Sequence, residues 1–146
     1  MTQGEGGEGL CESLRDTLAR LLRGTGLSPS DVKRIDLDPY GPRIIIEAEP
    51  QWAARISLDA SPDGVEATLA LAAPRGLDPL EAEEAILEAI EEAPGTDTLD
   101  EYDAGYDPEE GEIVAELRAA RLTHLPSLRE LAARITDAVR RLKEEG

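Results

Sequence analysis

The sequence contains no phenylalanine and only four aromatic residues, Tyr40, Trp52, Tyr102 and Tyr106. A hydrophobic core of this chain must therefore be built from many aliphatic contacts and not from a few large rings. The sequence also lacks any apolar run that approaches the roughly 20 residues of a membrane-spanning helix, so we expect no membrane segment. With 146 residues, 40% of them hydrophobic, the chain has the common size of one domain with one core.

Cysteine and histidine occur only once each. The single Cys11 excludes an internal disulfide framework and a multi-cysteine metal site, and we expect a reduced, cytoplasmic protein in which this thiol is buried and inert. His124 has no serine, cysteine or aspartate at a spacing that indicates a catalytic relay, so we interpret it as structural. The glycines of residues 4–9 do not follow a strand pattern and do not form a phosphate-binding loop. The sequence thus predicts a protein that is not an enzyme and has no cofactor or metal.

Basic residues are scarce, since 15 lysines and arginines stand against 32 acidic residues and the formal net charge is −17. A field of this sign disfavours direct binding to nucleic acid or to an anionic membrane. Excess acid commonly serves solubility, and a specific basic partner is the alternative interpretation. Residues 1–9 are acidic and glycine-rich where a secretory signal would be basic and then apolar, so we predict a disordered tail. A single domain is expected over residues 10–146.

Apolar residues recur at helical spacing in three segments. The first is residues 10–23, and the second runs from residue 79 to about residue 93 after a capping Asp78. The third begins between residues 123 and 127 and continues almost to the C-terminus. For its start, Pro126 favours a position near Leu125, whereas a capping box of Ser127 with Glu130 favours a later one.

Period-two alternation marks five short strands in the rest of the chain. Three of them predict an antiparallel meander: residues 43–49, 52–59 and 65–72. Two more, residues 98–106 and 112–119, predict a hairpin around an acidic turn. We expect the apolar face of these strands to lie beneath the two long helices at the ends of the chain. Residues 27–41 are interpreted as a connector at the domain edge, with a short irregular strand around Val32, Ile35 and Leu37.

Acidic residues gather in the second hairpin and raise the question of a calcium site. They are Asp100, Glu101, Asp103, Asp107, Glu109, Glu110 and Glu112. The pattern fails the EF-hand template, because Gly105 is not preceded by acids at alternate positions and the twelfth position falls at Gly111. We therefore interpret the cluster as solvated hairpin charge.

The less apolar face of the predicted sheet carries four residues that we select as a partner-binding site: Ile45, Ala70, Ala72 and Val114. They share this face with charged and hydroxyl side chains, and such a mixed surface can accept alternate side chains of an extended peptide. Isolated aliphatic residues on an ordinary surface are the other interpretation.

Three local stretches, taken in their order, carry a family resemblance. They are Gly24-Thr25-Gly26-Leu27-Ser28-Pro29, then Asp36-Leu37-Asp38-Pro39-Tyr40-Gly41, and then Leu69-Ala70-Leu71-Ala72-Ala73-Pro74-Arg75-Gly76. With these stretches, its size and its acidity, the chain resembles the class I type III secretion chaperones and the related YbjN-like bacterial proteins over about residues 10–143.

The resemblance implies an α+β domain with the order α-β-β-β-α-β-β-α, in which the N- and C-terminal helices pack on an antiparallel sheet. It also implies a homodimer, with Ile86, Leu87 and Ile90 of the second helix at or near the interface. Our leading hypothesis is a non-catalytic cytoplasmic chaperone or adaptor that holds an extended segment of a partner protein, such as a secreted one. The alternative is an acidic regulator or inhibitor that binds a basic protein surface, for example by mimicking nucleic acid.

Overall fold

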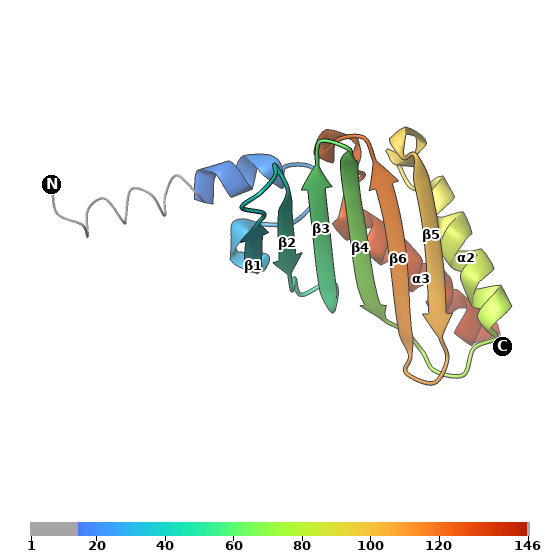
Figure 1. Ribbon diagram of the computed structural model, residues 1–146. Helices are drawn as coiled ribbons and strands as arrows, with labels where there is room; N and C mark the ends of the chain where they lie inside the picture. The colour runs from blue at the N-terminus through green and yellow to red at the C-terminus, as the bar shows by residue number, and fades with distance from the viewer. Residues whose placement is uncertain (1–14, 146) are drawn as a thin grey trace, which may run out of the picture.

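The computed structural model describes residues 15–145 and contains a six-stranded, fully antiparallel sheet with helices on one face (Figure 1). The strands are β1 (Val32–Leu37), β2 (Ile44–Ala48), β3 (Arg55–Ser61), β4 (Gly64–Ala72), β5 (Glu101–Asp107) and β6 (Glu112–Ala119). Their order across the sheet is β1-β2-β3-β4-β6-β5. The helices are residues 15–21, α2 (Pro79–Glu92) and α3 (Leu128–Glu145), with 3-10 turns η1 (Pro29–Asp31), η2 (Thr96–Thr98) and η3 (Leu122–His124).

The α+β class and the predicted order of elements are confirmed, and the expected connector supplies a sixth strand. This strand, β1, pairs with β2 through a register shift between Val32 and Arg34. A bulge inserts an unpaired residue and breaks the alternation of side chains, so the periodicity of residues 32–37 is weak in the sequence. The predicted tail over residues 1–9 and the predicted buried Cys11 lie outside the described residues.

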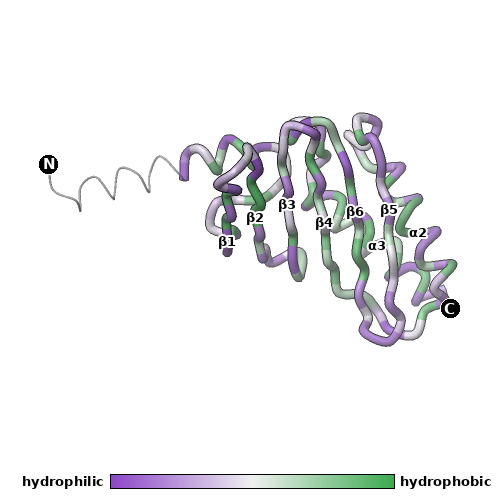
Figure 2. Tube along the Cα trace, viewed as in Figure 1, coloured by the Kyte–Doolittle hydropathy of each residue, from purple (hydrophilic) through white to green (hydrophobic). Residues whose placement is uncertain are grey.

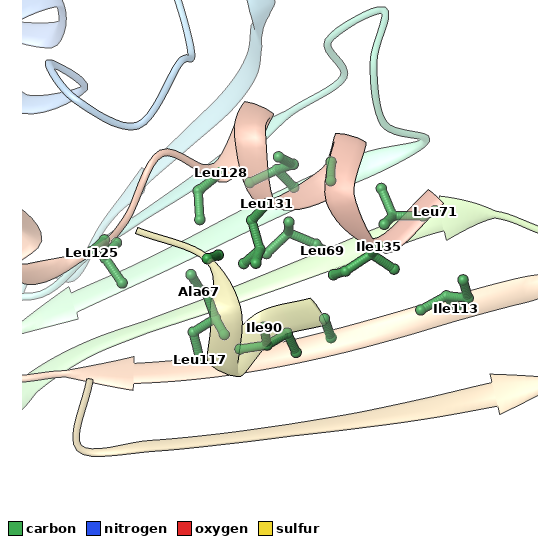
Figure 3. Packing of buried hydrophobic residues seen from close by; sticks show 14 of the residues in the cluster. Ala67, Leu69, Leu71, Ile90, Ile113, Leu117, Leu125, Leu128, Leu131 and Ile135 are labelled. Atoms are coloured by element: carbon green, nitrogen blue, oxygen red, sulfur yellow. The ribbon is translucent and has the colours of Figure 1, made fainter. Parts of the chain in front are cut away.

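The core lies between one face of the sheet and the two long helices behind it. Val65, Ala67, Leu69 and Leu71 of β4 alternate onto this face and are at most 3% exposed. Figure 3 shows Leu131 and Ile135 of α3 beside Leu69 of β4, with Ile90 of α2 beside Ala67 and Leu117. All of the labelled side chains are aliphatic, as the lack of aromatic residues requires.

The helices cover one face of the sheet, as predicted, and α2 lies there with them. α2 packs against β5 and α3, and α3 packs against β4. The first helix lies at the β1–β2 end of the sheet, and Leu22, directly after it, is 1% exposed and belongs to the core (Figure 1). The stripe of alanine and isoleucine on α2 permits this close approach, because small side chains let a helix lie near a sheet.

The N-terminal caps of α2 and α3 are formed by residues that the sequence analysis predicts. Asp78 Oδ2 accepts a hydrogen bond from the Glu81 N–H at 3.1 Å, as predicted for the start of α2. At α3 the later predicted start is observed, since Ser127 Oγ accepts the Glu130 N–H at 3.2 Å. The buried Thr25 reinforces this cap, because its carbonyl accepts the N–H of Leu128 at 2.7 Å. The turn after the first helix is thereby attached to the start of α3.

Candidate functional site

Within residues 15–145, no helix covers one face of the sheet, and we call this face the open face (Figure 1). It points toward the viewer in Figure 1, with α2 and α3 behind the strands. Residues that pair across neighbouring strands point to the same face, so the register defines the rows of side chains on it. Much of β5 and the turn into β6 is hydrophilic in the same view (Figure 2).

The β5–β6 hairpin places like charges directly opposite each other on the open face. Asp103 pairs with Glu116, and four residues further along the strand Asp107 pairs with Glu112. Directly opposed like charges destabilise a sheet by roughly 0.2–1 kcal/mol per pair. Asp107 also has a structural role, because its Oδ1 accepts the N–H groups of Glu109 and Glu110 in the turn, at 2.9 and 3.2 Å. Within residues 15–145, none of these four carboxylates forms an ion pair with an arginine or a lysine.

The sequence placed these acids in a hairpin but missed that they form opposed pairs. The signal was available, because the turn fixes the register: once Asp107 faces Glu112, Asp103 must face Glu116. Between the two acid pairs, Gly105 faces Val114. A Cβ atom on Gly105 would meet nothing within 4 Å, so the space above this position is open.

Other acids on the open face are neutralised by arginine. Arg118 Nη2 forms a very short ion pair with Glu66, and its Nη1 lies 3.5 Å from a carboxylate oxygen of Glu101. Arg43 binds both carboxylate oxygens of Asp59, with distances of 2.9 and 2.6 Å. Because these acids already have basic partners, the carboxylates free to attract a cationic ligand concentrate on β5 and β6.

Two shallow hollows lie side by side on this face. One, of about 440 Å³, is lined by residues of β4, β5 and β6 that include Thr68, Asp103 and Glu116. The other, of about 500 Å³, extends toward β3, and the two share Glu66 and Arg118. Both are open depressions, and in each of them four acids outnumber the arginines, which suits a ligand that lies on the surface and carries positive charge.

The predicted partner-binding residues share the open face but do not form one patch. Ala70 and Val114 are directly paired, and Ala72 lies two residues from Ala70 on β4, whereas Ile45 faces Asp59 on the other half of the sheet. Ala70 is only 3% exposed and offers almost no contact area, which corrects its selection as a binding residue. Its small side chain lies between Arg55 and Val114, and both neighbours are longer.

The predicted dimer-interface residues require a larger correction. Ile86 and Ile90 are fully buried in the core of the protomer itself, so they cannot contact another chain while the protomer is folded. The sequence predicts a stripe on one helix face, and the core of the same chain, not a second chain, covers that stripe. Leu87 is half-buried, and its place at an interface remains a prediction.

Arg43 lowers the pKa of Asp59, chiefly through its hydrogen bonds to that carboxylate, while burial opposes the shift. The folded-state pKa lies below the unfolded value of about 3.9, so the stabilisation is complete above about pH 4 and is lost as pH falls through the folded pKa. We expect Arg43→Gln to move the Asp59 midpoint upward toward the ordinary value. Carboxyl carbon chemical shifts followed against pH test this, and an unchanged midpoint would contradict it.

In the described part of the chain, no group of three or more histidine, cysteine, aspartate or glutamate residues is placed to hold a metal ion. Nor does any described helix combine the length and apolar character needed to cross a bilayer. His124 ends η3, and its carbonyl accepts a hydrogen bond from the Thr98 hydroxyl at 2.7 Å.

Comparisons of this chain with protein-family models, with curated proteins and with solved structures found no match.

Proposed function

We propose that this protein is a non-catalytic binding module whose open face holds an extended, basic segment of a partner protein. The observation that carries the proposal is the β5–β6 hairpin, where two opposed acid pairs lack basic partners and one of them, Asp103 with Glu116, lines a shallow hollow. Acids held opposite one another cost stability, and a cationic ligand between them would relieve the repulsion. The apolar surface nearby is small, since Ala70 is buried and Val114 is half-buried.

The spacing of the acid pairs fits an extended peptide. Asp103 and Asp107 are four residues apart on one strand, about 13 Å at 3.3–3.4 Å per residue. An extended peptide that lies along the strand repeats its side chains on one face every second residue, so its positions i and i+4 span the same length. Arginine or lysine at those two positions would face the acid pairs. A small or aliphatic residue at i+2 would lie above Gly105 and Val114.

An unstructured segment and a folded basic surface are two different partners for this face. The open face is broad and shallow, and the hollows on it are depressions and not a deep socket, which favours a thin, extended ligand. A regulator of a folded basic protein would need further contacts from that protein's surface. A short peptide should therefore suffice for binding under our proposal and should fail under the alternative.

The test is a binding titration by calorimetry with a short peptide that has arginine at positions i and i+4 and valine at i+2. Affinity should fall steeply between about 0.15 M and about 1 M salt, as the Debye length shrinks from about 8 Å to about 3 Å. The double variant Asp103→Asn/Glu116→Gln should weaken binding about tenfold at the lower salt, because two nearby charges are lost. Val114→Asp should not weaken it.

Two controls separate charge at the site from charge in general. A peptide with glutamate in place of arginine should not bind. The double variant Glu81→Gln/Glu84→Gln on α2 removes two negative charges, as the β5–β6 double variant does, but from the other side of the molecule, and it should leave the affinity unchanged. Binding that is insensitive to salt, and that Val114→Asp or Ile45→Asp abolishes, would instead indicate apolar recognition. Failure of every basic peptide to bind would reject the extended-segment proposal.

A further inference from the structure

The two edges of the sheet are protected to different degrees. An edge strand presents unpaired backbone N–H and C=O groups, and proteins commonly shield such edges with charge. β5 is shielded by three acids along its length, Glu101, Asp103 and Asp107. Asp103 also turns back to its own strand, where its Oδ1 accepts the Ala104 N–H at 2.8 Å. This edge repels another acidic chain.

β1 has no comparable shield. Its Lys33, Arg34 and Asp36 sum to a charge of +1, whereas the three acids of β5 sum to −3. Two apolar side chains on it are exposed, Ile35 by 38% and Leu37 by 70%. Within the described chain, no backbone group of residues 33–37 hydrogen-bonds to a segment outside the sheet. β1 is thus an exposed, partly apolar edge that is slightly positive on a strongly negative protein.

We propose that β1 pairs in antiparallel fashion with β1 of a second copy of this chain. The pairing is self-complementary when it is centred on Ile35. In that register Arg34 of each copy lies opposite Asp36 of the other, so the two-fold symmetry creates two oppositely charged cross-strand pairs. Ile35 lies opposite Ile35 of the second copy.

The charge distribution favours a second copy at this edge over the β5 edge. Each chain carries −17, so two copies repel each other over most approaches. Repulsion is weaker at β1, whose charges sum to +1, than at β5, and opposite charges can meet there. Arg34 and Asp36 now pair within the chain at 2.9 Å with side chains 65% and 46% exposed. An exposed ion pair of this kind contributes little to stability, so it can be replaced by an ion pair between the two copies.

The side chains of β1 match the two faces of the resulting sheet. Ile35 and Leu37 pair with Ile46 and Ile44 of β2, so they lie on the helix side, while Arg34 and Asp36 pair with residues of the open face. Directly opposed residues point to the same face, so the open faces of the two copies become continuous. Dimerisation through β1 would join two binding surfaces without covering either. The pairing does not depend on what the open face binds.

Charge reversal tests the register directly. Arg34→Asp places aspartate opposite Asp36 of the second copy at both symmetric positions, and Asp36→Arg places two arginines together. Each single variant should raise the dimer dissociation constant by at least about tenfold. The double variant Arg34→Asp/Asp36→Arg restores opposite charges and should restore the dimer. Arg140→Asp makes the same change of charge on an exposed position of α3 and is the matched control.

Sedimentation velocity over a range of protein concentrations measures the association. The wild type and the Arg140→Asp control should approach twice the 15.7 kDa of one chain, and the single β1 variants should not. Leu37→Glu, at a side chain already 70% exposed, should weaken the dimer. It should leave unchanged the thermal melt recorded at protein concentrations low enough for the wild type to be monomeric. A monomeric wild type at the highest concentration, or a dimer that Arg34→Asp leaves intact, would overturn the proposal. So would a double variant that remains monomeric.

Discussion

Ile90→Asp is expected to leave the chain largely unfolded. Ile90 is completely buried between α2 and the sheet, beside Ala67 and Leu117 (Figure 3). The substitution removes the packing of a large aliphatic side chain, which costs about 2–5 kcal/mol, and leaves an unpaired carboxylate in an apolar site, which costs several kcal/mol more. Since a domain is stabilised by only about 5–15 kcal/mol in total, this one change approaches the whole stability.

Leu87→Asp is the matched control on the same helix, because Leu87 is half-buried and its replacement can turn toward solvent. Urea unfolding followed by far-ultraviolet circular dichroism should show no folded baseline for Ile90→Asp and a folded, moderately destabilised Leu87→Asp. If Ile90→Asp folded normally and only lost association, Ile90 would belong to an interface between chains, and its position in the core would be wrong.

Gly26→Ala is the second change with a large expected effect. Gly26 has φ +88°, and a Cβ atom there would lie 2.6 Å from the Cβ of Arg129 at the start of α3. Alanine in the left-handed region costs about 1–2 kcal/mol. The collision adds to that cost, because the crowded atom belongs to a packed helix and cannot move alone. We expect a total loss of about 3 kcal/mol or more in the free energy of unfolding.

The chain supplies a control that separates the two contributions. Gly24 has the same φ of +88°, but a Cβ atom there would meet nothing within 4 Å. Gly24→Ala should therefore lose only the conformational contribution of about 1–2 kcal/mol. Chemical denaturation of both variants gives the difference. Equal losses would show that Gly26 is required for its conformation alone and that the turn does not press on α3.

Much of the fold is predictable because the local signals agree with the tertiary structure. The capping Asp78, the acidic hairpin turn and the apolar alternation of β4 each specify an element that the structure contains. β1 is predicted less clearly, as a short irregular strand within a connector, because its bulge disrupts the alternation of side chains. The place of α2 was also not determined by the sequence, since an apolar stripe can pack on the sheet of its own chain or on a second chain.

The residues of the candidate site were less predictable than the fold. Alternation correctly assigned Ile45 and Val114 to the less apolar face, but how much of each side chain remains exposed depends on neighbours from other strands. Ala70 illustrates this dependence, since it points to the open face and is nevertheless buried. The stripe on α2 shows the same limit, because periodicity identifies Ile86 and Ile90 as buried residues without identifying what buries them.

The most direct test of the central claim is to locate a bound peptide on the folded protein. The peptide with arginine at i and i+4 and valine at i+2 is titrated into ¹⁵N-labelled protein, and amide chemical shifts are followed. Our proposal predicts saturable shifts centred on β5 and β6, at Asp103, Gly105, Val114 and Glu116, with α2 and α3 unaffected. Shifts centred on the helices, or equal shifts with the glutamate peptide, would contradict an acidic open face that binds a basic extended segment.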